Sequence, residues 1–338
     1  MTDNRVQSAP VLRFKTPETA SPEAAEVLTA VYGASRETPQ PPKPVSQADF
    51  DAANLQMNAV FAPSNEAIVS RLGTTMRRDV LGGVPVLRLL PRRLQPSGRA
   101  IVYVHGGAYI YFSAETLVVL PALIAEATGC EVISIDYTLA PRARWQAVTD
   151  EVLAVWAALT ASGCKAGSLG LMGDSAGGGL ASGAVLKMRD AGLPLPGALW
   201  LVSPWSDISG AGDTYETLAD VDPVLAPEVL DWAARAYAEP EDQRHPYVSP
   251  VYGDYSGPFP ATLIQGGTRE MFLSNFVRHY QAIRNGGHEA VLDLYEAMPL
   301  VFQSLAPEAP EPDRDRPSSR LLRSASASIG TGLHSARA

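Results

Sequence analysis

The sequence is short of cysteine, of positive charge and of long apolar runs. Its 338 residues hold only two cysteines, Cys130 and Cys164, too few for the disulfide framework of a small secreted domain. We expect two buried thiols or, less readily, one bridge, in a reduced cytoplasmic protein. No apolar run approaches the ~18 residues of a membrane-spanning helix, and the first residues lack the basic-then-apolar pattern of a signal peptide. We therefore expect neither a membrane span nor a secretory leader.

The charge balance excludes two classes of partner. Lysine and arginine together number 27 against 36 acidic residues, which gives a formal net charge of −9. Because polyanions repel such a chain, we expect no nucleic-acid partner and no binding to an anionic membrane. The length, with 46% hydrophobic and 19% charged residues, is typical of one large globular α/β domain with a small appendage.

The most informative motif is the Gly-Asp-Ser-Ala-Gly segment at 173–177. An apolar run at 168–172 predicts a short buried strand before it, and small residues at 178–185 predict a helix after it. Strand, Gly-x-Ser-x-Gly and helix in this order make a nucleophile elbow, a turn that exposes a serine hydroxyl at the carboxyl end of a sheet. The pattern predicts that Ser175 is a nucleophile beside the positive end of a helix dipole.

A second glycine motif, His-Gly-Gly at 105–107, directly follows the strand candidate at 100–104. When a serine attacks an ester, the tetrahedral oxyanion needs hydrogen-bond donors that are already in place. Glycine lets backbone N–H groups come close because it has no Cβ. We expect the oxyanion hole to consist of the N–H groups of Gly106, Gly107 and Ala176. We expect His105 to orient the loop rather than to act as the base.

Strand and helix patterns alternate from residue 84 onward. This alternation predicts a largely parallel sheet with helices on both faces, and ligands of such sheets bind beyond the carboxyl ends of the strands. The strand candidates are 84–90, 100–104, 131–136, 168–173, 198–203, 261–266 and 289–295. The helix candidates are 115–128, 147–161, 176–190 and 272–285, with helical character also at 21–32 and 47–60.

Composition divides the chain into three parts. Residues 1–60, with a proline-dense stretch at 39–44, predict an N-terminal cap and linker segment. Residues 61–310 predict the α/β domain, with an insertion at about 206–258 that lacks strand alternation and contributes to the cap. The tail 311–338 is rich in Arg, Ser and Ala and predicts either a weak terminal helix or disorder.

These motifs together resemble the bacterial hormone-sensitive-lipase-like esterases, a group with the α/β-hydrolase fold. The matching segments span roughly residues 60–310 and are 105–108, 136–141, 173–178, 203–207, 265–270 and 296–302. The resemblance implies a mostly parallel eight-stranded sheet flanked by helices, with a helical N-terminal cap. It also implies a small-molecule substrate, a short- or medium-chain carboxylic ester or lactone, hydrolysed without a metal or other cofactor. A homodimer is left open.

The triad acid that the resemblance implies is Glu270, the single carboxylate in the loop after the strand candidate 261–266. A carboxylate there holds the catalytic imidazole in one tautomer and stabilises the imidazolium. Asn275 stands where many relatives have aspartate, but it cannot supply the charge. Asp207 is a weaker competitor that is better explained as a helix cap or a contact to the cap.

The triad base that the resemblance implies is absent. Relatives have Met-Pro-His-Val-Phe after the last strand, whereas this chain reads Met-Pro-Leu-Val-Phe at 298–302, with Leu300 in place of the histidine. Leucine cannot accept a proton, so Ser175 has no evident general base. The remaining histidines are better explained by packing or by other structural roles than as replacements; they are His245, His279, His288 and His334. Thr138 and Arg142 depart from the family pattern as well.

Three functions therefore stay open. The first is a serine hydrolase that forms an acyl-enzyme on Ser175 and is impaired by Leu300. The second is a non-catalytic protein of the same fold that binds a small molecule. The third is acyl transfer or another reaction in which the substrate supplies the base. Side chains that could line an apolar pocket are Tyr109, Tyr111, Phe112, Trp205 and Met298.

Overall fold

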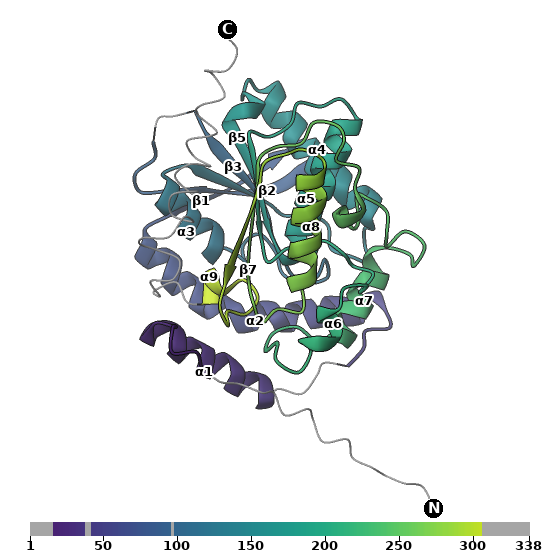
Figure 1. Cartoon of the computed structure of the whole chain (residues 1–338). Helices are drawn as coiled ribbons and strands as arrows, with labels where there is room; N and C mark the ends of the chain where they lie inside the picture. Colours follow the sequence, from purple (N-terminus) through teal and green to yellow (C-terminus); the bar gives the residue numbers. More distant parts are fainter. Residues whose placement is uncertain (1–15, 38–41, 96–97, 306–338) are drawn as a thin grey trace, which may run out of the picture.

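An eight-stranded sheet forms the centre of the molecule (Figure 1). The computed structural model describes residues 16–37, 42–95 and 98–305. The strands are β1 (Thr75–Leu81), β2 (Val84–Leu90), β3 (Ala100–Val104), β4 (Glu131–Ile135), β5 (Leu169–Asp174), β6 (Ala198–Val202), β7 (Thr262–Gly267) and β8 (Ala290–Tyr295). They lie in the order β1-β2-β4-β3-β5-β6-β7-β8. β2 is antiparallel to β1 and β4, and the other pairs are parallel. The predicted α/β-hydrolase fold with a mostly parallel sheet is confirmed.

The strands that can be predicted from the sequence are those whose residues are buried in the structure. The strands β3 to β7 are short apolar runs with nearly every residue buried, as the interior of a parallel sheet requires. Seven strands lie within one residue of the predicted ranges. The eighth, β1, is not predicted, because its Thr-Met-Arg-Arg-Asp-Val-Leu sequence lies largely exposed at the sheet edge and has no apolar period.

Helices cover both faces of the sheet, as predicted. The helices are α1 (Pro22–Glu37), α2 (Gln47–Leu72), α3 (Val119–Thr128), α4 (Trp145–Ala161), α5 (Ser175–Asp190), α6 (Thr214–Thr217), α7 (Pro227–Tyr237), α8 (Leu273–Asn285) and α9 (Phe302–Leu305). α4, α5 and α8 share one buried cluster with side chains of the central strands. α3 and the end of α2 pack on the other face, against Ile101, Tyr103 and Met172.

The helix α2 extends well beyond the predicted range 47–60. It begins at a capping box formed by Ser46 and Asp49 and ends at Gly73, whose φ of 74° is left-handed. Its side chains hold the segment that follows the His-Gly-Gly motif. Asn54 accepts the N–H of Phe112, and Asn58 accepts the hydroxyl hydrogen of Thr116. The helix therefore lies directly beside the predicted oxyanion loop.

The helix α1 covers the segment that follows β8. A small buried cluster joins the two, and its members are Ala24, Leu28, Tyr32, Tyr295, Met298 and Phe302. The Tyr32 hydroxyl also donates to the Val221 carbonyl of the insertion at 2.6 Å. This insertion contains α6, α7 and a 3₁₀ turn at Pro250–Tyr252, and no strand. The division into a cap and an α/β domain stays a prediction.

Both ends of the chain, 1–15 and the predicted tail at 311–338, lie outside the described residues. Cys130 and Cys164 are both free thiols; Cys130 is buried, as predicted, whereas Cys164 is half-buried. Among the helices that the structure describes, none is both long enough and apolar enough to cross a membrane.

Candidate active site

Ser175 occupies a tight turn between β5 and α5. β5 ends at Asp174 and the helix begins at the serine itself, whose φ of 50° is left-handed. A non-glycine residue adopts this backbone only where the surrounding structure enforces it. A Cβ on Gly173 would overlap the carbonyl of Gly177 across the turn. These are the features of a nucleophile elbow, and Ser175 remains the predicted nucleophile.

The His-Gly-Gly motif lies directly against the elbow. A Cβ on Gly106 would lie 3.1 Å from the Cβ of Ser175. However, the Gly106 N–H donates to Oδ1 of Asp174 at 2.8 Å, which differs from its predicted role as an oxyanion donor. The N–H groups of Gly107 and Ala176 donate to no other group in the described part of the protein. Two of the three predicted donors are thus free to receive an oxyanion.

Asp174 is a buried carboxylate that supports this arrangement. Its Oδ1 also accepts the hydroxyl hydrogen of Tyr103 from the neighbouring strand. Burial raises the pKa of Asp174 to about 6, while hydrogen bonds from Tyr103, from the Gly106 N–H and from its own backbone N–H oppose that rise. The side chain fixes the elbow to both β3 and the oxyanion motif.

Glu270 lies in the loop after β7 and is fully buried. Its Oε1 accepts the hydroxyl hydrogen of Ser203 at 2.9 Å and the N–H of Gly267. Its Oε2 has no hydrogen-bond partner within the described residues. Burial raises the pKa of Glu270 well above its usual value, and the nearby charge of Asp222 adds to the rise. Among the described residues, Oε1 of the carboxyl group thus accepts two hydrogen bonds and Oε2 accepts none.

The loop that carries Leu300 packs against the Glu270 loop. A Cβ on Gly267 would overlap the Met298 carbonyl, and the Val301 N–H donates to the Ser203 hydroxyl at 3.0 Å. Leu300 itself is partly buried and packs against the main apolar core. Val301 has a φ of 50°, which is strained for a β-branched residue. The residue before it is therefore held in a constrained loop beside the predicted acid.

His105 is buried next to the elbow and is engaged in the loop itself. Its Nδ1 lies 2.7 Å from the Gly106 carbonyl oxygen, and its ring stacks on Tyr137 with centroids 4.3 Å apart. Burial lowers its pKa. These contacts agree with the expected loop-orienting role.

The remaining described histidines bind groups in other parts of the fold. His279 contacts three hydroxyls, those of Ser182, Ser206 and Tyr255, and burial lowers its pKa to about 3. His245 and His288 contact backbone groups of neighbouring loops. His334 lies outside the described residues. The hydrogen bonds of these three described side chains connect none of them to Ser175 or Glu270.

The competing carboxylate Asp207 is part of a structural ion pair. It is fully buried, and its Oδ2 accepts from Arg278 at 2.6 Å and from Tyr252 at 2.9 Å.

Asp222 is a buried carboxylate that the sequence does not reveal, because it lies in the insertion without any motif. It accepts three backbone N–H groups, including that of Met271 next to Glu270, and burial raises its pKa to about 6.

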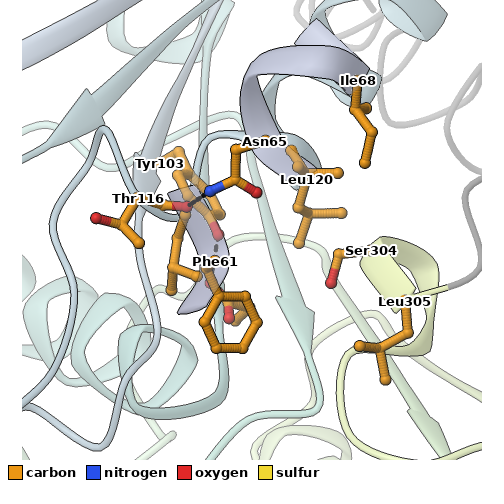
Figure 2. Close-up of a pocket in the computed structure, with 11 residues that line it drawn as sticks. Phe61, Asn65, Ile68, Tyr103, Thr116, Leu120, Ser304 and Leu305 are labelled. Atoms are coloured by element: carbon orange, nitrogen blue, oxygen red, sulfur yellow. Dashed lines mark hydrogen bonds between the residues drawn. The ribbon is translucent and has the colours of Figure 1, made fainter. Parts of the chain in front are cut away.

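A pocket of about 250 Å³ lies beside the elbow (Figure 2). It is lined by residues of α2, β3, α3 and α9 together with Asp174. None of the five side chains predicted as pocket walls lines it. Tyr109 and Trp205 are instead buried in an aromatic stack with Tyr237, and Met298 packs under α1.

Comparisons with known proteins agree with this geometry. Residues 101–304 match a protein family whose description is the alpha/beta hydrolase fold. The chain is 33% identical to an acetyl-hydrolase of Streptomyces hygroscopicus over 220 residues, which cover 65% of this chain and 73% of that protein. The crystal structure of an esterase is similar with a TM-score of 0.82 and 29% identity, over 94% of this chain and 96% of that one. A hormone-sensitive lipase from a metagenome library gives a TM-score of 0.80 and 29% identity, over 90% and 98%.

Proposed function

The chain belongs to the hormone-sensitive-lipase-like esterases of the α/β-hydrolase fold, a family of carboxylic ester hydrolases, and from this premise we propose that Ser175 is its nucleophile and that Leu300 impairs its turnover. The substrate would be a short- or medium-chain ester or lactone. The unpartnered Oε2 of Glu270 carries this proposal. A buried carboxylate oxygen is normally hydrogen-bonded, and the imidazole N–H of a triad is the donor that would satisfy it.

The proposed reaction is ester hydrolysis through an acyl-enzyme on the serine. Ser175 Oγ bonds to the ester carbonyl carbon, and the carbonyl electron pair moves onto oxygen. The free N–H groups of Gly107 and Ala176 would stabilise that oxyanion. Collapse expels the alcohol and leaves an acyl-enzyme, which water then hydrolyses. Each step needs a group that takes a proton and returns it. Because Leu300 supplies none, the serine proton passes to water, and water protonates the departing alkoxide.

The size of the impairment follows from the missing proton transfer. Loss of the base in a serine triad lowers kcat by up to about 10⁶-fold, while the oxyanion hole and binding alone leave about 10³–10⁴-fold over water. We therefore expect slow residual hydrolysis by this chain. A cytoplasmic location and a homodimer stay predictions.

The decisive experiment is Leu300→His, with turnover of p-nitrophenyl butyrate as the readout. By the family pattern a histidine at this position would donate to Glu270 and accept the proton of Ser175, so kcat/KM should rise by about 10³-fold or more. Adding Ser175→Ala or Glu270→Gln to the Leu300→His variant should remove most of this gain. A folded Leu300→His protein with unchanged turnover would contradict the proposal.

A second candidate function is binding without turnover. The pocket beside the elbow favours it, because the pocket is present although the base is absent. This candidate predicts that Ser175→Ala leaves both ligand affinity and the negligible turnover unchanged.

A third possibility is a substrate that supplies its own base. It predicts products that change with substrate class, and a loss of all of these products in Ser175→Ala.

A further inference from the structure

The walls of the pocket in Figure 2 are mainly apolar, and most of their apolar side chains come from three helices. Phe61 and Ile68 project from α2, Leu120 from α3 and Leu305 from α9. Its volume of about 250 Å³ lies just below the range of drug-sized sites, roughly 300–1,000 Å³. At about 30 Å³ for a water-sized group, the pocket holds a ligand of roughly eight non-hydrogen atoms.

Asn65 presents an acceptor oxygen to this pocket. Its side-chain nitrogen donates to the Thr116 carbonyl, and because a carbonyl can only accept, this contact fixes which way round the amide lies. Figure 2 shows the amide oxygen on the side away from Thr116. No residue in the described ranges donates to that oxygen.

Asp174 provides a second acceptor. Its hydrogen bonds with other residues, from the Gly106 N–H and from the Tyr103 hydroxyl, both go to Oδ1. Oδ2 accepts a hydrogen bond from no other residue in the part of the chain that the structure describes. Tyr103 uses its only hydroxyl hydrogen on Asp174, and Ser304 uses its own on the Val301 carbonyl at 2.9 Å. The side-chain donors at the pocket are therefore occupied, whereas two side-chain acceptors are open.

We propose that this pocket binds an alkyl chain of about six carbons that carries a hydrogen-bond donor, either a hydroxyl group or a protonated amine. The chain would contact Phe61, Ile68 and Leu305, and the donor would meet Asn65 Oδ1 and Asp174 Oδ2. This inference goes beyond the proposed hydrolysis, because binding does not need Ser175 to turn over.

Charge separates the two kinds of donor. Burial raises the pKa of Asp174 to about 6, so the carboxylate is mainly ionised at pH 8 and favours an ammonium group over a hydroxyl. The start of α3 at the same wall has no side-chain cap at Val118, and an uncapped helix start favours an anion. A carboxylate ligand is therefore the informative competitor.

The test is a titration of the full chain at pH 8 with four probes of similar size, with Kd measured by NMR. The probes are 1-hexanol, hexylamine, 2-hexanone and hexanoate. Hexylamine and 1-hexanol should bind, 2-hexanone should bind roughly 5-fold more weakly than 1-hexanol because it lacks a donor, and hexanoate should bind at least ~10-fold more weakly. Equal or tighter binding of hexanoate or 2-hexanone, or no binding of any probe, would overturn the proposal.

Substitutions in the pocket test where the ligand binds. Ile68→Trp should fill the pocket and abolish binding, whereas Leu55→Trp on the same helix, where the native side chain is 72% exposed, should leave Kd unchanged. Asp174→Asn keeps an oxygen for Tyr103 and Gly106 but loses the charge, so it should weaken hexylamine by about 10-fold and 1-hexanol by much less. Unfolding curves establish that each variant is folded; should Ile68→Trp not fold, Asn65→Leu replaces it, with loss of the preference for 1-hexanol over 2-hexanone as the expected result. Unchanged affinities in folded variants would show that the ligand binds elsewhere. This result does not depend on whether the protein hydrolyses esters.

Discussion

The Ser203 hydroxyl donates to the buried carboxylate of Glu270 at 2.9 Å. The same oxygen accepts the N–H of Val301 at 3.0 Å, so one side chain ties the loop after β7 to the loop that carries Leu300. The predicted acid is thus held by the same hydroxyl that binds the loop of Leu300, the predicted position of the base. Only the second carboxylate oxygen lacks its partner.

Ser203→Ala should be strongly destabilising for so small a change. It removes two hydrogen bonds and leaves Glu270 Oε1 with only the Gly267 N–H, so the free energy of unfolding should fall by about 2–3 kcal/mol. Urea unfolding measures this. Ser162→Ala, at an exposed helix end, is the matched control and should change stability by less than about 0.5 kcal/mol. Equal effects of the two substitutions would show that the link contributes nothing.

Glu270 should make the protein less stable as the pH rises. Burial raises its folded pKa well above the usual value, so the folded state holds more protons than the unfolded state between the two pKa values. Its contribution is therefore complete below about pH 4.3 and is lost as the pH rises through the folded pKa. Glu270→Gln removes this titration, so its stability relative to the unmodified protein should increase from about pH 5 to about pH 8. Urea unfolding of both proteins across this range gives the difference, and parallel pH profiles would refute the prediction.

Arg278→Met should be costly because it leaves Asp207 charged, buried and unpaired. Asp207 is fully buried and Arg278 contacts it at 2.6 Å, and removal of one partner from a buried pair costs about 3–5 kcal/mol. The partial exposure of Arg278 lowers our expectation to about 2–3 kcal/mol in thermal or urea unfolding. Arg235→Met breaks the exposed pair with Asp231 and should cost at most about 0.5 kcal/mol. A loss no larger than this control would mean that water replaces Arg278.

The sequence predicts the parts of this site that depend on backbone shape. The elbow needs Gly173 where side chains would collide, and the buried strands are continuous apolar runs, so both are visible as patterns. It does not predict that Asp174 engages the Gly106 N–H, because that depends on which side chain turns toward the loop. Nor does it predict Asp222, whose place beside Glu270 is set only when the insertion folds back onto the loop after β7.

The packing of α1 onto the segment after β8 has a consequence for how the chain can be handled. Ala24, Leu28 and Tyr32 cover the apolar side chains of that segment, so the N-terminal helix and the loop around Leu300 should lose amide-exchange protection together. Truncation before residue 42 would uncover Met298 and Phe302 and loosen the backbone on which any histidine at position 300 depends. The first helix therefore supports the loop in which the base is predicted, and an expression tag or a deletion there would also alter that loop.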